Sequence, residues 1–349
     1  MSDQELLDSF ESQIAWSGRL GSPFYETLHR VLRDDFLARG PVFALLHDWP
    51  GHPADDALTL RVTGGLNFLV RAGEAPALTP LWPDADADPA ALGAAVTTTL
   101  EANQPFFDGF LKHAVQTNET GRAAVLLPGM IEIARTTQKP LALLEIGASA
   151  GLNLMWNRFH YDLGGTPWGD PASPVHLTLG WDGPKPDLSL HPEIMARAAC
   201  DIGPLDIHDP GALSRALAYI WPDMPARIAR FEAAATLARA EGVRVDQASA
   251  DDWLAVKLDA RPHNAVTVLY HSIMWQYMPD AVQARIQTLM EKAGAQATAD
   301  APLAWLAFEP PVALGLPELR LTLWPTGETR RLAYCHPHGV DLKWVDEPV

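Results

Sequence analysis

The sequence predicts an α/β protein: an all-helical N-terminal domain, then a mostly parallel β-sheet that ends in an antiparallel hairpin. Up to about residue 135, apolar residues recur at helical spacing. From residue 141, short apolar runs alternate with helical segments, which is typical of βαβ units. The last two runs, 319–324 and 330–335, flank a short loop containing Gly327, as in a β-hairpin. We therefore expect a helical domain over 1–135 and a sheet domain over 136–349.

Apolar spacing and capping residues locate the N-terminal helices. Ser22 and Pro23 have the pattern of a helix N-cap followed by proline at the first helical position. Segments rich in proline separate the helices, at 49–53 and 78–88. The expected helices are a first one through Leu6, Phe10, Ile14 and Trp16, a second from Pro23 through Leu32, a third over 55–71 and a fourth over 89–112.

Seven apolar runs are candidate strands of the sheet. We expect helices between them at 151–158, in pieces over 209–241, and at 280–292. A stretch rich in Gly and Pro at about 159–181 does not fit the alternation, and we interpret it as an inserted hairpin. The candidate strands are 141–146, 194–200, 243–245, 265–270, 303–308, 319–324 and 330–335.

Composition excludes several classes of function. The 349 residues include 43 acidic and 26 basic side chains, a net charge of −17, which argues against nucleic acid as a partner. No apolar run approaches the ~20 residues of a membrane span, and the first residues do not resemble a secretory signal. Two cysteines are too few for a disulfide framework. We expect a cytoplasmic protein that acts on a small molecule.

Small residues follow the first apolar run. The segment Glu145–Gly151 reads E-I-G-A-S-A-G and leads into an expected helix. A turn of this kind needs small residues where a ligand must reach backbone N–H groups. Taken alone, the glycine spacing is weak, because any tight strand–helix turn produces it, and a purely structural role stays open.

A second acid follows the next apolar run. Asp201 stands where a neighbouring parallel strand should end, so its carboxylate is placed to bind ribose hydroxyls. The usual separation of the glycine turn and this acid is ~20 residues, whereas Asp201 comes 56 residues after Glu145. The inserted stretch accounts for the excess. Asp162 is closer in sequence, but it lies in the expected hairpin, and we prefer Asp201.

With these motifs the chain resembles the class I S-adenosylmethionine-dependent methyltransferases and, more narrowly, the uncharacterised bacterial domain-of-unknown-function family 2332. The resemblance implies a Rossmann-like seven-stranded sheet and S-adenosylmethionine as cofactor. The segments that carry it are Gly21–Tyr25, Gln116–Glu119 with Gly121–Arg122, Leu144–Leu154, Tyr161–Asp162 with Gly169–Pro171, Asp201–Asp206, His271–Pro279 and His336–Gly339.

The resemblance also implies roles for single residues. Glu145 would face the methionine amino group, Asp201 would hold the ribose, and the stretch from Ala248 to Trp253 would lie beside the adenine. The cofactor-binding residues so implied are Glu145, Gly147, Ala148, Ser149, Gly151, Asn153, Asp201, Ser249 and Ala250.

Two positions depart from the family pattern. Ser149 stands where many methyltransferases have a middle glycine. Ser249 replaces the Asp commonly found beside the adenine amino group, unless Asp246 or Asp251 serves instead.

The loop after the fourth strand is expected to face the site, because ligands bind at the carboxyl ends of parallel strands. His271 is a candidate general base. Trp275 and Tyr277 are candidate aromatic walls for a sulfonium cation, and Tyr277 is a second candidate for deprotonating the acceptor. The alternative is that Trp275 belongs to the core and His271 is a hydrogen-bonded buried side chain.

A polar stretch, Gln116–Arg122, precedes the sheet domain. It is expected to cap the pocket, with the planar guanidinium of Arg122 binding a carboxylate of the ligand. The alternative is a hydrogen-bonding cluster between the domains.

Other sites are less favoured. His336 and His338 with Asp341 are candidate metal ligands, but they lack cysteine partners and we expect no metal. The motifs of α/β-hydrolases and P-loop NTPases are absent. The leading hypothesis is a methyltransferase whose helical domain closes over the pocket and selects the acceptor. A degenerate methyltransferase fold that only binds or regulates is one alternative. A nicotinamide-dependent oxidoreductase is another, disfavoured because the turn is not G-x-G-x-x-G.

Overall fold

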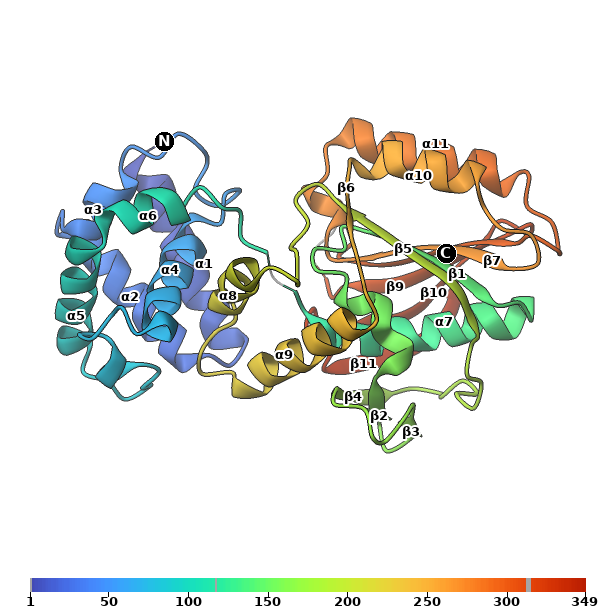
Figure 1. The fold of residues 1–349 in the computed structure, drawn as a ribbon, viewed down its shortest axis with the longest axis horizontal. Helices are drawn as coiled ribbons and strands as arrows, with labels where there is room; N and C mark the ends of the chain where they lie inside the picture. The colour runs from blue at the N-terminus through green and yellow to red at the C-terminus, as the bar shows by residue number, and fades with distance from the viewer. Residues whose placement is uncertain (1, 117, 312–314) are drawn as a thin grey trace. The chain divides into compact units, whose positions relative to one another are not determined.

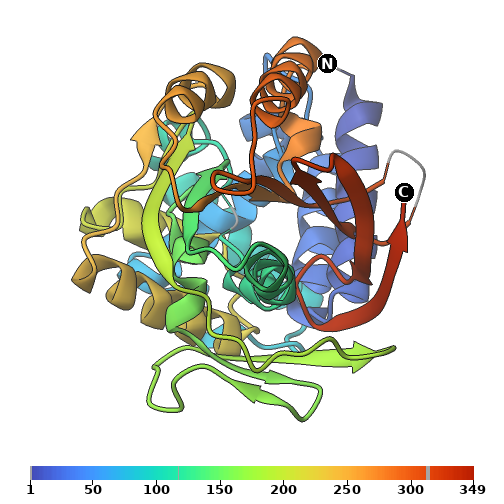
Figure 2. The ribbon, with the colours of Figure 1, turned by 90° about the vertical axis from the view of Figure 1, so that its right-hand side faces the viewer.

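The computed structural model describes residues 2–116, 118–311 and 315–349, and the chain divides into two compact units. The helical unit comprises Met1–Thr117 and Asp209–Ala229. The sheet unit comprises Asn118–His208 and Arg230–Val349. The helical unit thus includes a segment from within the range 136–349 of the expected sheet domain, and the path of the chain through each unit can be followed in Figure 1 and Figure 2.

Helices build the first unit, as predicted. Ser22 caps the second of them with Pro23 at its first turn, and the side-chain oxygen of Ser22 accepts from Tyr25 N–H. The expected helix 89–112 is divided at Asn103, because Pro105 lacks an N–H and lies in the first turn of a new helix that begins at Gln104. The helices are α1 (Asp3–Arg19), α2 (Pro23–Leu37), α3 (Pro41–Leu46), α4 (Leu58–Ala72), the short 3₁₀ helix η1 (Thr79–Leu81), α5 (Pro89–Ala102), α6 (Gln104–Phe110) and α8 (Pro210–Ala218).

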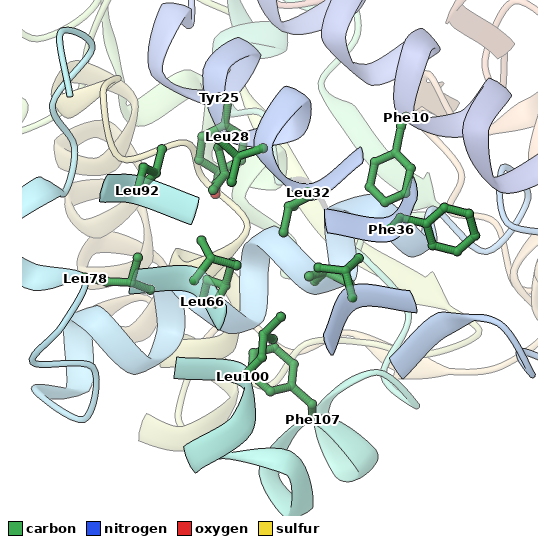
Figure 3. Packing of buried hydrophobic residues seen from close by; sticks show 14 of the residues in the cluster. Phe10, Tyr25, Leu28, Leu32, Phe36, Leu66, Leu78, Leu92, Leu100 and Phe107 are labelled. Atoms are coloured by element: carbon green, nitrogen blue, oxygen red, sulfur yellow. The ribbon is translucent and has the colours of Figure 1, made fainter. Parts of the chain in front are cut away.

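Apolar side chains from these helices form one core. Figure 3 shows Phe10 of α1 beside Phe36 of α2, with ring centroids 6.1 Å apart. Leu66 of α4 and Leu100 of α5 belong to the same cluster and are fully or almost fully buried. Among the described residues, no helix combines the length and apolarity that a membrane span requires.

Side-chain hydrogen bonds hold the segment Asp209–Ala229 in the helical unit. The Asp223 carboxylate accepts from Ser22 Oγ at 2.7 and 2.8 Å and from Phe24 N–H at 3.3 Å, so it caps α2. The Asn67 amide donates to the carbonyls of Ala218 and Ile220 at 2.9 and 3.1 Å. Without the segment Asp209–Ala229, the Ser22 hydroxyl, the Phe24 N–H and the Asn67 amide would therefore lose these acceptors.

The second unit is built on a sheet of 11 strands among the described residues, mostly parallel with an antiparallel C-terminal part. The α/β class and the terminal antiparallel pairing are confirmed, and the sheet extends beyond the seven strands expected. The strand order is β3-β2-β4-β11-β10-β9-β8-β7-β1-β5-β6. The strands are β1 (Leu141–Ile146), β2 (His160–Leu163), β3 (Pro167–Trp168), β4 (His176–Asp182), β5 (Ile194–Asp201), β6 (Asp246–Gln247), β7 (Val266–Ser272), β8 (Leu303–Glu309), β9 (Glu318–Trp324), β10 (Glu328–Cys335) and β11 (Asp341–Pro348).

The additional strands come from two places. The stretch expected as a hairpin supplies the antiparallel pair β2–β3, and also β4, which lies parallel to β2. The other is β11, which pairs antiparallel with β10 and parallel with β4. Sequence analysis missed β11 because polar residues alternate along it and no apolar run marks it.

One local expectation was wrong. The run 243–245 is not a strand, and pairing with β5 begins at Asp246, at the start of β6. Val243 and Val245 instead pack on Gly151, where an added Cβ would lie 3.0 and 2.9 Å from their methyl groups. The helical segment expected at 151–158 is confirmed, as the 3₁₀ helix η3 (Leu152–Arg158).

The strand order reverses beside β1. From β1 the chain continues outward through β5 to β6 on one side, and through β7 to β8 on the other, all in parallel. In an open parallel sheet, ligands bind in the crevice at the carboxyl ends of the strands at such a switch point. The fold therefore directs attention to the ends of β1, β5 and β7.

Helices cover both faces of these central strands. The helices α10 (Ala250–Asp259) and α11 (Asp280–Gly294) pack on one face, and α7 (Ala123–Thr137) lies on the other (Figures 1 and 2). Leu144 and Ile146 of β1 and Leu269 of β7 form the core beneath α10 and α11. The remaining helices are the 3₁₀ helices η2 (Thr120–Arg122) and η4 (Trp275–Tyr277), and α9 (Pro225–Ala240), which spans the boundary between the units.

Replacing Asp223 tests the cap on α2. We expect Asp223→Ala to lower the free energy of unfolding by about 1–2 kcal/mol, because Ser22 Oγ and Phe24 N–H lose their acceptor. Urea denaturation measures this, with Asp86→Ala at an exposed position as the control. Equal stability of the two variants would contradict the assignment.

Candidate functional site

The turn after β1 brings backbone into the switch point. Gly147, Ser149 and Gly151 adopt φ angles of +63°, +50° and +70°. Glycine takes up this left-handed conformation freely, whereas a residue with a side chain is strained there by about 1 kcal/mol or more. Ser149 is therefore a strained residue in the middle of the turn.

Asp201 is bonded directly to this turn. Its Oδ2 accepts from the backbone N–H of Ser149 at 2.8 Å, and its Oδ1 accepts from Gly203 N–H at 2.9 Å. The two strands are parallel neighbours, with Ile146 opposite Cys200, and Ala148 N–H donates to the Cys200 carbonyl at 3.1 Å. The structure thus brings both strand-end acids of the sequence analysis to one edge of the sheet.

Glu145 is buried at the end of β1. It is 3% exposed, and its Oε2 accepts from the hydroxyl of Tyr270 on β7 at 3.0 Å. Burial raises the pKa of the Glu145 carboxyl to about 8; the Tyr270 hydrogen bond opposes this and the charge of Asp201 adds to it. At neutral pH this carboxyl is therefore mostly protonated, and a nearby cation would favour its ionised form.

Buried polar atoms without partners surround the turn. Within the described part of the chain, Ser149 Oγ, Asn153 Oδ1 and Asn118 Nδ2 are buried and have no hydrogen-bond partner. The other end of the Asn118 amide, Oδ1, accepts from Ala150 N–H at 3.0 Å. Each unsatisfied buried polar group costs about 1–3 kcal/mol, and native proteins contain few of them. These three unpartnered polar atoms make the switch point the candidate place for a polar ligand.

His271 is enclosed in a hydrogen-bonded cluster. It is 2% exposed, and the indole N–H of Trp305 donates to its Nε2 at 3.0 Å. Because an indole N–H only donates, Nε2 carries the lone pair and the proton is on Nδ1, which donates to Glu309 at 2.7 Å. The ring also stacks on Trp275, with centroids 5.0 Å apart. Both ring nitrogens are therefore engaged, as in the alternative that made His271 a hydrogen-bonded buried side chain.

Glu309, at the end of β8, holds the loop after β7. Its carboxylate accepts from the N–H of Met274 at 3.1 Å and from that of Trp275 at 3.3 Å, besides the His271 ring. The loop is strained, because Ile273, a β-branched residue, has a φ of +50°. Met274 lies on the glycine turn: a Cβ added to Gly147 would lie 2.5 Å from its terminal methyl group. The loop therefore covers one side of the turn.

The third strand end also lies beside Asp201, whose carbonyl accepts from Ala248 N–H at 3.0 Å. Ser249, directly before Ala250 and α10, donates its hydroxyl to the Asp251 carboxylate. Burial acts to raise the pKa of Asp251, but the hydrogen bonds from Ser249 and Arg285 outweigh it and the pKa is lowered.

Asp246 and Ile202 also lie near the carboxyl end of β5, in different surroundings. Asp246 accepts from the indole N–H of Trp253 at 2.7 Å, so it is engaged as Asp251 is. Ile202, directly after Asp201, is 81% exposed. An apolar side chain thus stands open beside the strand-end acid.

Two predicted site residues lie in other surroundings. Tyr277 is 75% exposed in η4. The guanidinium of Arg122 donates to the carbonyls of Pro337 and Ser272 at 3.1 and 3.2 Å. In the polar stretch 116–122, Thr117 lies outside the described residues.

The histidines near the C-terminus interact with each other. His336 Nδ1 accepts from His338 N–H at 3.2 Å. In the part of the chain that the structure describes, no three His, Cys, Asp or Glu side chains gather in a way that could hold a metal ion.

The sequence did not identify Met274 or Glu309 as site residues. It pointed to the stretch Gln116–Arg122, but not to Asn118 within it. A signal for Glu309 was present: it follows the apolar run 303–308, as Asp201 follows its own. Nothing in the sequence indicates that Met274 packs on Gly147.

A family model described as an uncharacterized protein conserved in bacteria, DUF2332, matches residues 8–344. No curated protein and no solved structure gave a match.

The unpartnered hydroxyl of Ser149 predicts an unusual gain in stability. We expect Ser149→Ala to raise the free energy of unfolding by about 1 kcal/mol, because an unsatisfied buried hydroxyl is removed. Ser173→Ala is the matched control: Ser173 is also buried, but its hydroxyl donates to the Arg158 carbonyl at 2.8 Å, so this variant should lose stability. Denaturation curves in which both variants lose stability would contradict the prediction.

The raised pKa of Glu145 predicts a pH dependence. Between pH 4.5 and 8 the folded protein keeps a proton that the unfolded chain releases, so this group's contribution to stability is lost as pH rises. From pH 5.5 to 7.5, the free energy of unfolding should fall by on the order of 2 kcal/mol more in the wild type than in Glu145→Gln. Glu328→Gln, at an exposed carboxyl, should follow the wild type. Parallel pH profiles of the wild type and Glu145→Gln would refute the assignment.

Proposed function

The chain belongs to the DUF2332 family of uncharacterized proteins conserved in bacteria, and we propose that it is an S-adenosylmethionine-dependent methyltransferase acting on a small molecule. In this proposal, the strands β6, β5, β1, β7, β8, β9 and β10 are the seven-stranded Rossmann-like core, extended by β11 and the inserted strands. The adenosyl ligand binds at the carboxyl ends of β1 and β5.

One observation carries the proposal: the Asp201 carboxylate is hydrogen-bonded to the Ser149 peptide in the middle of the turn. It supports a site in which the ribose and the amino-acid end of one ligand are held by adjacent strand ends. Both Asp201 oxygens already accept one N–H, but a carboxylate has about four lone-pair sites, so capacity remains for ribose hydroxyls.

The surrounding residues fit the remaining parts of the ligand. Glu145 is buried and its raised pKa falls when an ammonium group binds beside it, so ligand binding would release a proton. Ile202 offers an exposed apolar surface next to Asp201, suited to the face of an adenine. Ser249 and Ala250 follow β6, whose carboxyl end lies beside that of β5.

The chain's own residues supply orientation and exclusion of water. S-Adenosylmethionine, when bound, supplies an activated methyl group on a sulfonium. Met274 and the loop held by Glu309 shield the turn from solvent, and the strained turn holds its backbone N–H groups in place. His271 acts through Glu309 as a positioning residue, because both of its ring nitrogens are hydrogen-bonded and neither is available to deprotonate the methyl acceptor.

A second candidate function is binding without turnover. Two observations favour it. Both ring nitrogens of His271 are already hydrogen-bonded, and Tyr277 is exposed to solvent. Neither residue is therefore placed to take a proton from a methyl acceptor. It predicts adenosyl binding with no methyl transfer to any acceptor tested.

Calorimetry with S-adenosylmethionine, S-adenosylhomocysteine and NAD tests the proposal. Both sulfur ligands should bind saturably and NAD should not. Ile202→Ser should weaken S-adenosylhomocysteine about tenfold or more by removing apolar contact with the base. Val256→Ser, which removes another exposed apolar side chain of the same unit, should change affinity less than twofold. Saturable NAD binding with no response to either sulfur ligand would overturn the proposal.

A further inference from the structure

Asn118 presents a buried amino group that nothing in the described protein binds. Its Oδ1 accepts from Ala150 N–H at 3.0 Å, and because that N–H only donates, the amide oxygen must face it. The orientation of the amide is therefore fixed. Its Nδ2, with two donor hydrogens, is buried and without a partner among the described residues.

A second donor without a partner belongs to the residue directly before Ala150 in the chain. Ser149 precedes Ala150, and its Oγ is likewise buried and without a partner in the described structure. Two unused donors thus flank one peptide of the turn. Unpartnered hydrogen-bond donors on either side of one peptide favour a ligand that only accepts, and an anionic oxygen is the strongest such acceptor.

A purely structural cap does not explain this arrangement. To cap Ala150, Asn118 needs only its oxygen, and a buried unsatisfied amino group has a cost of desolvation. Arg122, the carboxylate partner expected from sequence, is instead directed at the Pro337 and Ser272 carbonyls. Two kinds of polar group therefore lie around the turn. Glu145 has a carboxyl group at the end of β1, whereas Asn118 and Ser149 have neutral hydrogen-bond donors.

We propose that Asn118 and Ser149 bind the α-carboxylate of the ligand's amino-acid end, so that the site selects an adenosyl amino acid over the same nucleoside without a carboxylate. The inference rests on the proposed function and adds its ligand specificity. Neutral donors that are already oriented and desolvated bind a carboxylate at little further cost in ordering.

Three ligands and three variants test the specificity. Wild type, Asn118→Asp, Asn118→Ala and Asn157→Asp are titrated with S-adenosylhomocysteine, S-adenosylmethionine and decarboxylated S-adenosylmethionine. Asn118→Asp keeps an oxygen for Ala150 N–H but replaces the donors with a negative charge. Asn157→Asp adds the same charge on η3, where Oδ1 accepts from Arg197 at 2.7 Å, and serves as the control.

In the wild type, the two carboxylate ligands should bind at least tenfold more tightly than decarboxylated S-adenosylmethionine. Asn118→Asp should weaken the carboxylate ligands at least tenfold while the decarboxylated ligand binds as well as before or better. Asn118→Ala should bring the two classes toward equal affinity, without an added charge. Asn157→Asp should leave the preference unchanged within about twofold.

Each contrary outcome has a definite meaning. Equal loss of all three ligands in Asn118→Asp and Asn118→Ala, or no loss of either class, would overturn the role of Asn118 and leave the proposed function standing. If the wild type binds none of the adenosyl ligands, the proposed function fails and this inference fails with it. Thermal unfolding of each variant confirms that a folded protein is being titrated.

Discussion

The hydrogen bond between the Asp201 carboxylate and the Ser149 peptide is the interaction on which the site depends. It joins the end of β5 to the turn after β1, so that two segments 52 residues apart in the chain form one surface. Parallel pairing alone would bring the strand ends near each other. The carboxylate fixes the turn in its left-handed conformation, in spite of a serine at its centre.

Backbone strain and unsatisfied polar groups both occur around this interaction. Ser149 and Ile273 have left-handed backbone, and Asn118 and Ser149 carry buried polar atoms without partners in the described structure. Such features reduce stability and persist where the surrounding structure enforces them, commonly at binding sites. In the sheet unit the enforcing groups are carboxylates at strand ends: Asp201 for the turn and Glu309 for the loop after β7. The site is therefore best understood as backbone held in place by half-buried acids at strand ends.

Patterns local in sequence predicted the parts of the fold that local physics determines. The apolar runs mark the strands β1, β5, β7 and β8, of which β1 and β7 are buried on both faces, and small residues mark the turn at Gly147. Features that depend on distant partners were not predictable. Polar β11 is a strand because β10 and β4 pair with it, and the helices of Asp209–Ala229 belong to the helical unit because Asp223 and Asn67 bond there. Asn118 likewise gains its role only through Ala150, and His271 is enclosed by Trp305 and Glu309.

A crystal structure of the protein grown with S-adenosylhomocysteine tests the central claim most directly. The account predicts ribose hydroxyls within hydrogen-bonding distance of Asp201, the amino-acid end on the turn at Gly147 to Gly151, and the adenine against Ile202. Density for the ligand at any other place on the chain, or none at a saturating concentration, would contradict it.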